Sequence, residues 1–348
     1  MTNNKIKVLV VDDTAFMRKA IPQILESDSL IEVADAAKNG LEALYKIREL
    51  QPDVITLDID MPIMDGLTAI KHIMIESPVP IVALSSLFSN GAITFEALRL
   101  GVADFVPKPS GAISTDIDKS RQQITDRVKM AFAMNLDNVR RVRLPKKWDV
   151  KKRLESLYKF YPLEYIIVIG TTLAGPNTVI RLLSKLSPTV PAAIIVIQEI
   201  SPKIISSFVE QFNEYVPWNV VVAKNNSALE QGTCYMSSNE DSLTLRLNEN
   251  GEIRLHSGAK INYPLNCLFS SAAEIFRQNT IGVLLSGIGD DGADGFARIK
   301  HESGITIAKD ATCCVYPNLT DNAIRQGVVD IILDDNKLAS TLEAIVEN

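Results

Sequence analysis

Short apolar segments alternate with amphipathic helical segments along most of this chain, and this alternation limits the folds that it can adopt. In the first part of the chain the apolar segments read KVLVV (7–11), IEVADAA (31–37), DVITL (53–57), PIVALS (80–85) and DFVP (104–107). A helical pattern follows each of the first four, beginning near Thr14 after the first. Strands that alternate with helices in this way predict a parallel sheet with helices on both faces.

A second series of the same kind begins at Tyr165. The expected strands read YIIVIG (165–170), AAIIVIQ (192–198), NVVVAKN (219–225), TIGVLLSG (280–287), GITIAKD (304–310) and VVDIIL (328–333). Between the third and fourth of these, an antiparallel excursion is expected through GTCYMSS (232–238), SLTLRLN (242–248) and EIRLHS (252–257). The sequence therefore predicts an α/β protein with two doubly wound parallel-sheet domains, the second carrying an antiparallel hairpin excursion.

Composition narrows the class of protein. The chain has 348 residues, enough for two domains with separate cores, and 46% hydrophobic with 22% charged residues is typical of a globular protein. A net charge of −6 argues against nucleic-acid binding over the whole surface. The four cysteines show no CxxC spacing, so we expect reduced thiols. Without a membrane-length apolar run or a signal-peptide pattern, the expected location is the cytoplasm, with no membrane insertion and no nucleic-acid partner.

The strand pattern stops between about residues 110 and 160. This part contains RRVRLPKKWDVKKR (140–153), with eight basic residues and one acidic residue. We interpret it as a solvated linker and divide the chain into a first domain (1–125), a basic interdomain linker (126–162) and a second domain (163–348). Contact with nucleic acid or an anionic membrane surface is the alternative, which is weakened because Trp148 is the only aromatic residue of the stretch.

Polar side chains end several strands of the first domain. Asp12 and Asp13 follow KVLVV, Asp58 follows DVITL, Ser85 ends PIVALS and Lys108 follows DFVP. The carboxyl ends of strands in an open α/β sheet meet in one crevice, so these groups should lie together. Three carboxylates need a cation between them, and oxygen ligands suit Mg²⁺. With the ammonium and the hydroxyl, the site could hold a phosphoryl group.

Residues 5–125 resemble a two-component receiver domain, which has a flavodoxin-like fold. The resemblance is carried by VVDD (10–13), LDIDMPIMDG (57–66), ALSS (83–86) and DFVPKP (104–109). It implies that Asp58 is phosphorylated by a histidine kinase of a chemotaxis-type system. It also implies a Mg²⁺ site and a phosphoryl-binding switch. For Mg²⁺, the resemblance implies Asp13, Asp58 and the backbone carbonyl of Asp60 as ligands, with Asp12 in support. For the switch, it implies Ser85, Lys108 and Phe105.

In the second domain, YIIVIGTTLAGP (165–176) runs from a strand through a small-residue turn into a helix, which is the geometry that presents a nucleophile at a sheet edge. Within it, VIGTTLAGP (168–176) resembles the IGASTGGP motif of the CheB family of chemoreceptor methylesterases. The resemblance extends over residues 165–335. VIQEISP (196–202) resembles the family's VQHMP, and LLSGIGDDGADG (284–295) resembles LTGMGxDGAxG. ITIAKDAT (305–312) resembles TIAQDE, and NAIRQGVVDIIL (322–333) resembles the family's closing segment.

The resemblance places the family's nucleophilic serine at Thr172, its general-base histidine at Glu199 and its orienting aspartate at Asp291. A serine hydrolase needs a neutral base that becomes a cation beside the carboxylate. Glu199 beside Asp291 instead puts two anions together, and one of them is expected to hold a proton. The extra methyl group of Thr172 crowds its hydroxyl. Hydrolysis is therefore expected to be impaired, although a glutamate can serve as a general base.

Other positions of the expected pocket also depart from the family. The departures are SSNE (237–240) for an APGG-type turn, Asn266 for a carboxylate, PNL (317–319) for GMP, and Ile288 for methionine between Gly287 and Gly289. The three histidines, at positions 72, 256 and 301, are expected to be surface or packing residues. A phosphate loop at Gly170 and Gly175 is disfavoured, because Pro176 and Asn177 replace its lysine and hydroxyl. Cys313 and Cys314 could supply a nucleophile, but buried thiols are the commoner case.

The leading hypothesis is a phosphorylation-controlled response regulator whose CheB-like domain is catalytically impaired and acts as a binding or regulatory module, docking to chemoreceptors or another sensory complex. The alternative is an active protein-glutamate methylesterase and glutamine deamidase that uses Thr172, Glu199 and Asp291. A third hypothesis is a phosphate sink that drains a shared kinase. An intact site at Asp58 beside an altered triad favours the first of these.

Overall fold

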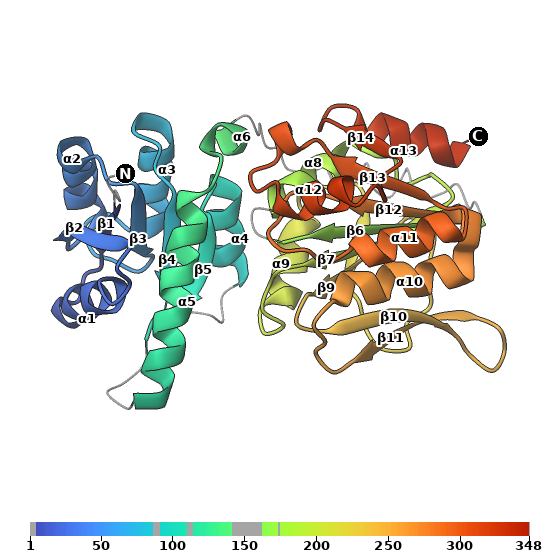
Figure 1. The fold of residues 1–348 in the computed structure, drawn as a ribbon, viewed down its shortest axis with the longest axis horizontal. Coiled ribbons are helices and arrows are strands. Elements are labelled where there is room, and N and C mark those ends of the chain that lie inside the picture. Colours follow the sequence, from blue (N-terminus) through green and yellow to red (C-terminus); the bar gives the residue numbers. More distant parts are fainter. Residues whose placement is uncertain (1–4, 86–90, 110–113, 141–161, 173–174, 348) are drawn as a thin grey trace. The chain divides into compact units, whose positions relative to one another are not determined.

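The computed structural model describes residues 5–85, 91–109, 114–140, 162–172 and 175–347 (Figure 1). The chain divides into two compact units, Met1–Arg141 and Val142–Asn348. The predicted end of the first domain at residue 125 falls inside helix α5 (Ser114–Phe132), which is followed by α6 (Leu136–Arg140). Residues 141–161 of the predicted linker, with almost all of its basic stretch, lie outside the described residues.

The first unit is built on a five-stranded sheet in the order β2-β1-β3-β4-β5, and every neighbouring pair is parallel. Helices α1 and α5 pack against each other, while α2, α3 and α4 pack in sequence, which confirms the predicted doubly wound fold. The remaining bounds are β1 (Ile6–Val11), α1 (Ala15–Leu25), β2 (Ile31–Ala37), α2 (Gly40–Leu50), β3 (Val54–Asp58), α3 (Gly66–Glu76), β4 (Ile81–Ser85), α4 (Gly91–Leu100) and β5 (Asp104–Pro107).

Side-chain caps begin three of these helices directly after the loops that follow strands β1, β2 and β3. Thr14, Asn39 and Asp65 each accept a hydrogen bond from a backbone N–H in the first turn of α1, α2 and α3. Each cap satisfies an N–H group that has no partner within the helix. The strand ends and helix starts are therefore fixed together at one edge of the sheet, where the predicted site residues lie.

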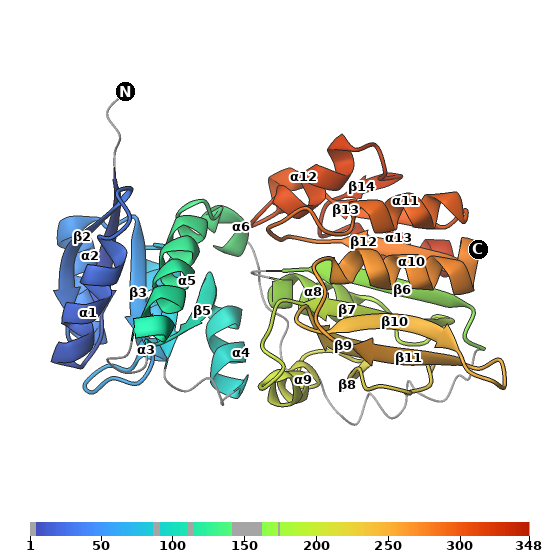
Figure 2. The ribbon, with the colours of Figure 1, turned by 60° about the horizontal axis from the view of Figure 1, so that its bottom comes forward.

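The second unit has a seven-stranded sheet in the order β14-β13-β12-β6-β7-β9-β8, and all of its pairs are parallel. Helix α10 lies between this sheet and the β10–β11 hairpin, which pairs antiparallel (Figure 2). The bounds are β6 (Tyr165–Thr171), α8 (Gly175–Lys185), β7 (Ala192–Gln198), α9 (Ile205–Phe212), β8 (Asn219–Val222), β9 (Thr233–Ser238), β10 (Ser242–Leu247), β11 (Ile253–Gly258), α10 (Pro264–Phe276), η1 (Arg277–Asn279), β12 (Thr280–Leu284), α11 (Ala293–His301), β13 (Ile305–Lys309), η2 (Ala311–Cys313), α12 (Asn318–Arg325), β14 (Ile331–Leu333) and α13 (Leu338–Glu347).

The predicted antiparallel excursion was wrong in one element. Strand β9, within GTCYMSS, belongs to the main sheet and pairs parallel with both β7 and β8. All six of its residues are buried, as in an inner strand of a parallel sheet covered on both faces. In β10 only alternate residues are buried, which is typical of a strand with one face packed on the protein.

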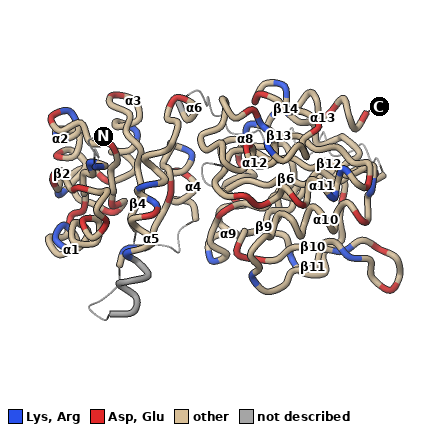
Figure 3. The backbone as a smooth tube through the Cα atoms, viewed as in Figure 1, with Lys and Arg blue, Asp and Glu red and all other residues tan. Residues whose placement is uncertain are grey.

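Charged residues of both signs are distributed over each unit. Basic and acidic residues are interspersed along the described elements of both units (Figure 3). Of the helices that the structure describes, none combines the length and the apolar character that crossing a membrane requires.

Candidate functional site

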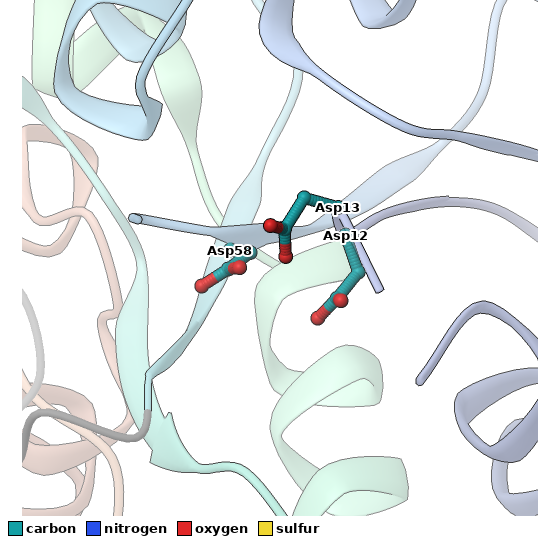
Figure 4. A group of neighbouring side chains, drawn as sticks. All are labelled: Asp12, Asp13 and Asp58. Atoms are coloured by element: carbon teal, nitrogen blue, oxygen red, sulfur yellow. The ribbon is translucent and has the colours of Figure 1, made fainter. Parts of the chain in front are cut away.

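The acidic site of the first unit lies at the carboxyl ends of two neighbouring strands. Asp12 follows β1, Asp58 ends β3, and the parallel pairing of these strands brings the two side chains together with Asp13. One carboxylate oxygen from each of the three lies within 4.8 Å of the others (Figure 4). Asp12 and Asp58 are buried, whereas Asp13 is exposed. The predicted group of acids is therefore present as a compact cluster open on one side.

Lys108 bridges two of these acids. Its Nζ lies 2.8 Å from Asp12 Oδ2 and 2.7 Å from Asp58 Oδ2. Burial raises the pKa of the Asp58 carboxyl, and the charge of Asp12 adds to this, while Lys108 opposes it. Burial alone would lower the pKa of Lys108, but its two carboxylate partners outweigh that effect and raise it. Lys108 therefore stays charged and partly neutralises the cluster.

The donor set fits Mg²⁺. Asp12 is buried, its Oδ2 is paired only with Lys108 Nζ among the contacts given for the described residues, and one of its carboxylate oxygens lies within 4.8 Å of those of Asp13 and Asp58. Oxygen atoms are the ligands that Mg²⁺ prefers, and carboxylates supply the negative charge that it needs. This acidic pocket is typical of a Mg²⁺ site. The backbone N–H of Asp60 donates to Asp58 Oδ1 at 3.3 Å, which places the predicted carbonyl ligand of Asp60 on the turn beside Asp58.

The residues predicted to form the switch lie on or directly after the next two strands of the sheet. Ser85 is the buried last residue of β4, and the backbone N–H of Lys108 donates to its carbonyl oxygen at 3.1 Å. Phe105 lies on β5 and packs partly buried against the core of the unit. The backbones of Ser85 and Lys108 therefore lie side by side at the sheet edge, and the switch role of these residues stays a prediction.

The three triad positions of the second unit line one cavity of about 310 Å³. Thr172 directly follows β6, Glu199 directly follows β7, and Asp291 lies in the loop after β12, so all three occupy the carboxyl edge of the sheet. Residues 173–174, which complete the predicted elbow and phosphate loop, lie outside the described residues. Of the described residues that line this cavity, none is a histidine or a cysteine.

Backbone groups hold the hydroxyl of Thr172. The Ile288 N–H donates to Thr172 Oγ1 at 2.7 Å, while the Ile288 carbonyl oxygen lies 3.5 Å from the same atom. This approach requires glycine at position 287, because a Cβ there would lie 2.6 Å from Thr172 Oγ1. Both glycines expected to give this loop its conformational freedom are needed for a physical reason. Gly289 adopts a φ of +113°, which favours glycine, and Gly287 leaves space for the Thr172 side chain. The hydroxyl oxygen thus already accepts one hydrogen bond.

Asp291 makes its contacts with the start of helix α10. Its two carboxylate oxygens accept the backbone N–H of Leu265 at 2.8 Å and of Asn266 at 3.0 Å. Burial raises the pKa of the Asp291 carboxyl, against the effect of these hydrogen bonds and one from Gly292. The carboxylate therefore serves as a cap for two N–H groups that the helix itself leaves unpaired.

Asn266 returns the same interaction. Its Oδ1 accepts the backbone N–H of Gly292 at 3.0 Å and of Gly295 at 2.9 Å, at the start of α11. Helices α10 and α11 thus cap each other through one side chain each. From the sequence, Asn266 was interpreted only as a lost carboxylate, and this capping role was missed. An asparagine three positions into a helix that begins with proline gives no local signal of a tertiary cap.

The comparisons with known proteins cover both units. A family model for the CheB methylesterase matches residues 167–342, and one for the response regulator receiver domain matches residues 8–115. A protein-glutamate methylesterase/protein-glutamine glutaminase of Caldanaerobacter subterraneus subsp. tengcongensis is 36% identical, over 97% of this chain and 96% of its own length. The chain belongs to the CheB methylesterase family.

Further relatives of this CheB-type response regulator span its whole length. A protein of the same name from Pyrococcus abyssi is 33% identical over 100% of this chain and 95% of its own length. Among solved structures, the CheB methylesterase catalytic domain of Thermotoga maritima is 27% identical, covering 52% of this chain and 98% of that domain with a TM-score of 0.49. The two family models place the receiver domain before the CheB-type domain, in the order that the motifs predicted.

The remaining candidate nucleophiles and bases of this CheB-type chain lie away from the cavity. Burial raises the pKa of the Cys314 thiol to about 11, which keeps it protonated at neutral pH. His72 lies on α3 beside Glu76, and the other two histidines lie on β11 and at the end of α11. These placements agree with the surface and packing roles expected for the histidines.

Proposed function

We propose that Asp58 accepts a phosphoryl group from a phosphohistidine of a chemotaxis-type kinase in the cytoplasm and that this modification controls the CheB-type domain. The observation that carries the proposal is the cluster of Asp12, Asp13 and Asp58 bridged by Lys108. The receiver family model supports it independently.

The described residues can perform this transfer in one step. An Asp58 carboxylate oxygen attacks phosphorus, the P–N bond to the kinase imidazole breaks, and the imidazole leaves with the bonding electrons. Lys108 is already within hydrogen-bonding distance of Asp58 and can move with the transferred group to bind a phosphoryl oxygen, to which the Ser85 hydroxyl can donate a hydrogen bond. A bound Mg²⁺, held by Asp12, Asp13 and Asp58, would neutralise charge on the transferred phosphoryl group.

For the CheB-type domain we propose binding of glutamyl side chains of a chemoreceptor in the cavity beside Thr172, with hydrolysis that is slow or absent. Three features support impairment: glutamate in place of a histidine base, an Asp291 carboxylate bonded to the N-terminus of α10, and a Thr172 oxygen that accepts the Ile288 N–H. A base that is itself anionic gains no stabilisation from a neighbouring carboxylate when it takes a proton.

The second candidate is an active protein-glutamate methylesterase and glutaminase. The comparisons support it more directly than they support an impaired site, because both relatives carry that name. In this candidate Glu199 is the general base for Thr172. Substitution Glu199→Gln would then abolish turnover, and the rate would rise with pH as the glutamate loses its proton.

The experiment that tests the proposed regulation is labelling of the purified chain by a phosphorylated chemotaxis-type kinase. Labelling is expected to require Mg²⁺ and to disappear in Asp58→Asn, with the single-residue control Asp53→Asn labelled normally because Asp53 lies at the other end of β3. Receptor fragments should then bind the labelled chain more tightly than Asp58→Asn. Labelling that survives in Asp58→Asn would remove Asp58 as the acceptor.

A further inference from the structure

Arg18 makes a contact that the phosphoryl-transfer assignment does not use. It lies near the start of α1, and its Nη1 donates to the backbone carbonyl oxygens of Asp12 at 2.9 Å and Asp13 at 2.7 Å. One guanidinium therefore closes the turn between β1 and α1 around the two residues that supply acids to the cation site. Carbonyl oxygens gain a charge-assisted hydrogen bond from such a donor, which is stronger than a neutral one.

The two acids differ in what fixes their side chains. Asp12 Oδ1 accepts the N–H of Thr14 at 2.9 Å and its hydroxyl at 2.8 Å, and Asp12 Oδ2 lies 2.8 Å from Lys108 Nζ. Asp13 is exposed, and its carboxylate accepts no hydrogen bond from any residue in the described part of the chain. The direction of the Asp13 carboxylate therefore depends on the backbone that Arg18 holds.

We propose that Arg18 is a positioning residue for the divalent-cation site and that it acts chiefly through Asp13. The inference rests on the proposed phosphorylation of Asp58. Without the Arg18 hydrogen bonds, the turn between β1 and α1 would have to become ordered when the cation binds. Ordering a residue costs conformational entropy, so cation binding would be weaker. Loss of an outer partner of a metal ligand typically weakens metal binding by about 10- to 100-fold, and for a partly exposed site we expect an effect at or below the lower end of this range, about threefold to tenfold.

The sign of the effect separates positioning from simple charge. The guanidinium is positive and repels an incoming divalent cation, so an electrostatic role alone predicts that removing it strengthens Mg²⁺ binding. A positioning role predicts the reverse. The two accounts therefore give opposite shifts in the dissociation constant for the same substitution.

The experiment is calorimetric titration of Mg²⁺ into the full chain. Arg18→Met keeps an apolar stem of similar length and removes the donors, and Lys19→Met is the matched control because it removes one charge from the next, exposed position. Arg18→Met is expected to raise the Kd for Mg²⁺ about threefold to tenfold, while Lys19→Met leaves it unchanged or lowers it. Arg18→Lys, with a shorter side chain that can reach one carbonyl, should give an intermediate Kd.

A second readout separates this role from a general loss of structure. With acetyl phosphate as donor, Arg18→Met should need more Mg²⁺ for half-maximal labelling of Asp58 but reach the wild-type rate at saturating Mg²⁺. A Kd equal to or below that of the wild type overturns the inference, and if Arg18→Met does not fold, a wild-type Kd for Arg18→Lys overturns it. Failure of the wild-type chain to bind Mg²⁺ or become labelled would instead refute the proposed function itself.

Discussion

Replacing Asp291 tests whether its carboxylate is a structural cap. In Asp291→Ala the N–H groups of Leu265 and Asn266 lose both acceptors at the start of α10. Hydrogen bonds to a charged group contribute about 1.5–3 kcal/mol each, and loss of a helix cap typically costs about 0.5–2 kcal/mol. Burial, which raises the pKa of Asp291, offsets part of this gain. We expect the second domain to lose about 2–3 kcal/mol of stability.

The measurement is urea unfolding of the full chain followed by tryptophan fluorescence. The chain has two tryptophans, and in a Trp148→Phe background only buried Trp218 in the second unit reports. Asp290→Ala is the matched control, because it removes an exposed carboxylate from the same loop. If Asp291 had only a catalytic role, burial of its charge would cost stability, and replacing it with alanine would make the folded domain more stable. An Asp291→Ala variant that is as stable as the Asp290→Ala control, or more stable, therefore refutes the structural assignment.

Three further substitutions test the packing and electrostatics of the second unit. Asp335→Ala leaves buried Lys309, whose Nζ lies 2.9 Å from Asp335, without that counter-charge, and should cost about 3 kcal/mol in urea unfolding. Gly287→Ala puts a methyl group against Thr172 and should cost about 1–3 kcal/mol, with a shifted Thr172 resonance in methyl NMR spectra. Burial acts to raise the pKa of Asp330, but its hydrogen bonds and ion pair outweigh this and lower it below the ordinary 3.8. Its charged form thus stabilises the fold above that value, and the advantage of the wild type over Asp330→Asn should shrink as pH falls from about 5 to 3. Unchanged stability in the first two variants, or a pH-independent difference in the third, would contradict these assignments.

Much of the fold and of the first site follows from sequence pattern. Continuous apolar strands alternating with helices specify the parallel sheets, and because strand ends meet at one edge, Asp12, Asp58 and Lys108 could be grouped without coordinates. Strand β9 was misassigned because its pairing depends on burial on both faces, which a six-residue segment does not reveal.

Contacts between segments far apart in the chain could not be predicted. The caps that Asp291 and Asn266 exchange join residues about 25 positions apart, and each looks locally like an ordinary polar residue. The bond from Arg18 to two carbonyls depends on the direction of α1 relative to β1. Family resemblance located Asp291 but assigned it only the orienting role of the triad, whereas its contacts in this chain are with a helix N-terminus.

The measurement that tests the central claim most directly is methanol release from methylated chemoreceptor by the full chain after phosphorylation of Asp58. Wild type, Asp58→Asn and Thr172→Ala would be compared with the same receptor and phosphodonor. The account predicts that the phosphorylated wild type releases methanol slowly at most, at a rate close to that of Thr172→Ala. Rapid release that requires phosphorylation and disappears in Thr172→Ala would show a working esterase and contradict it.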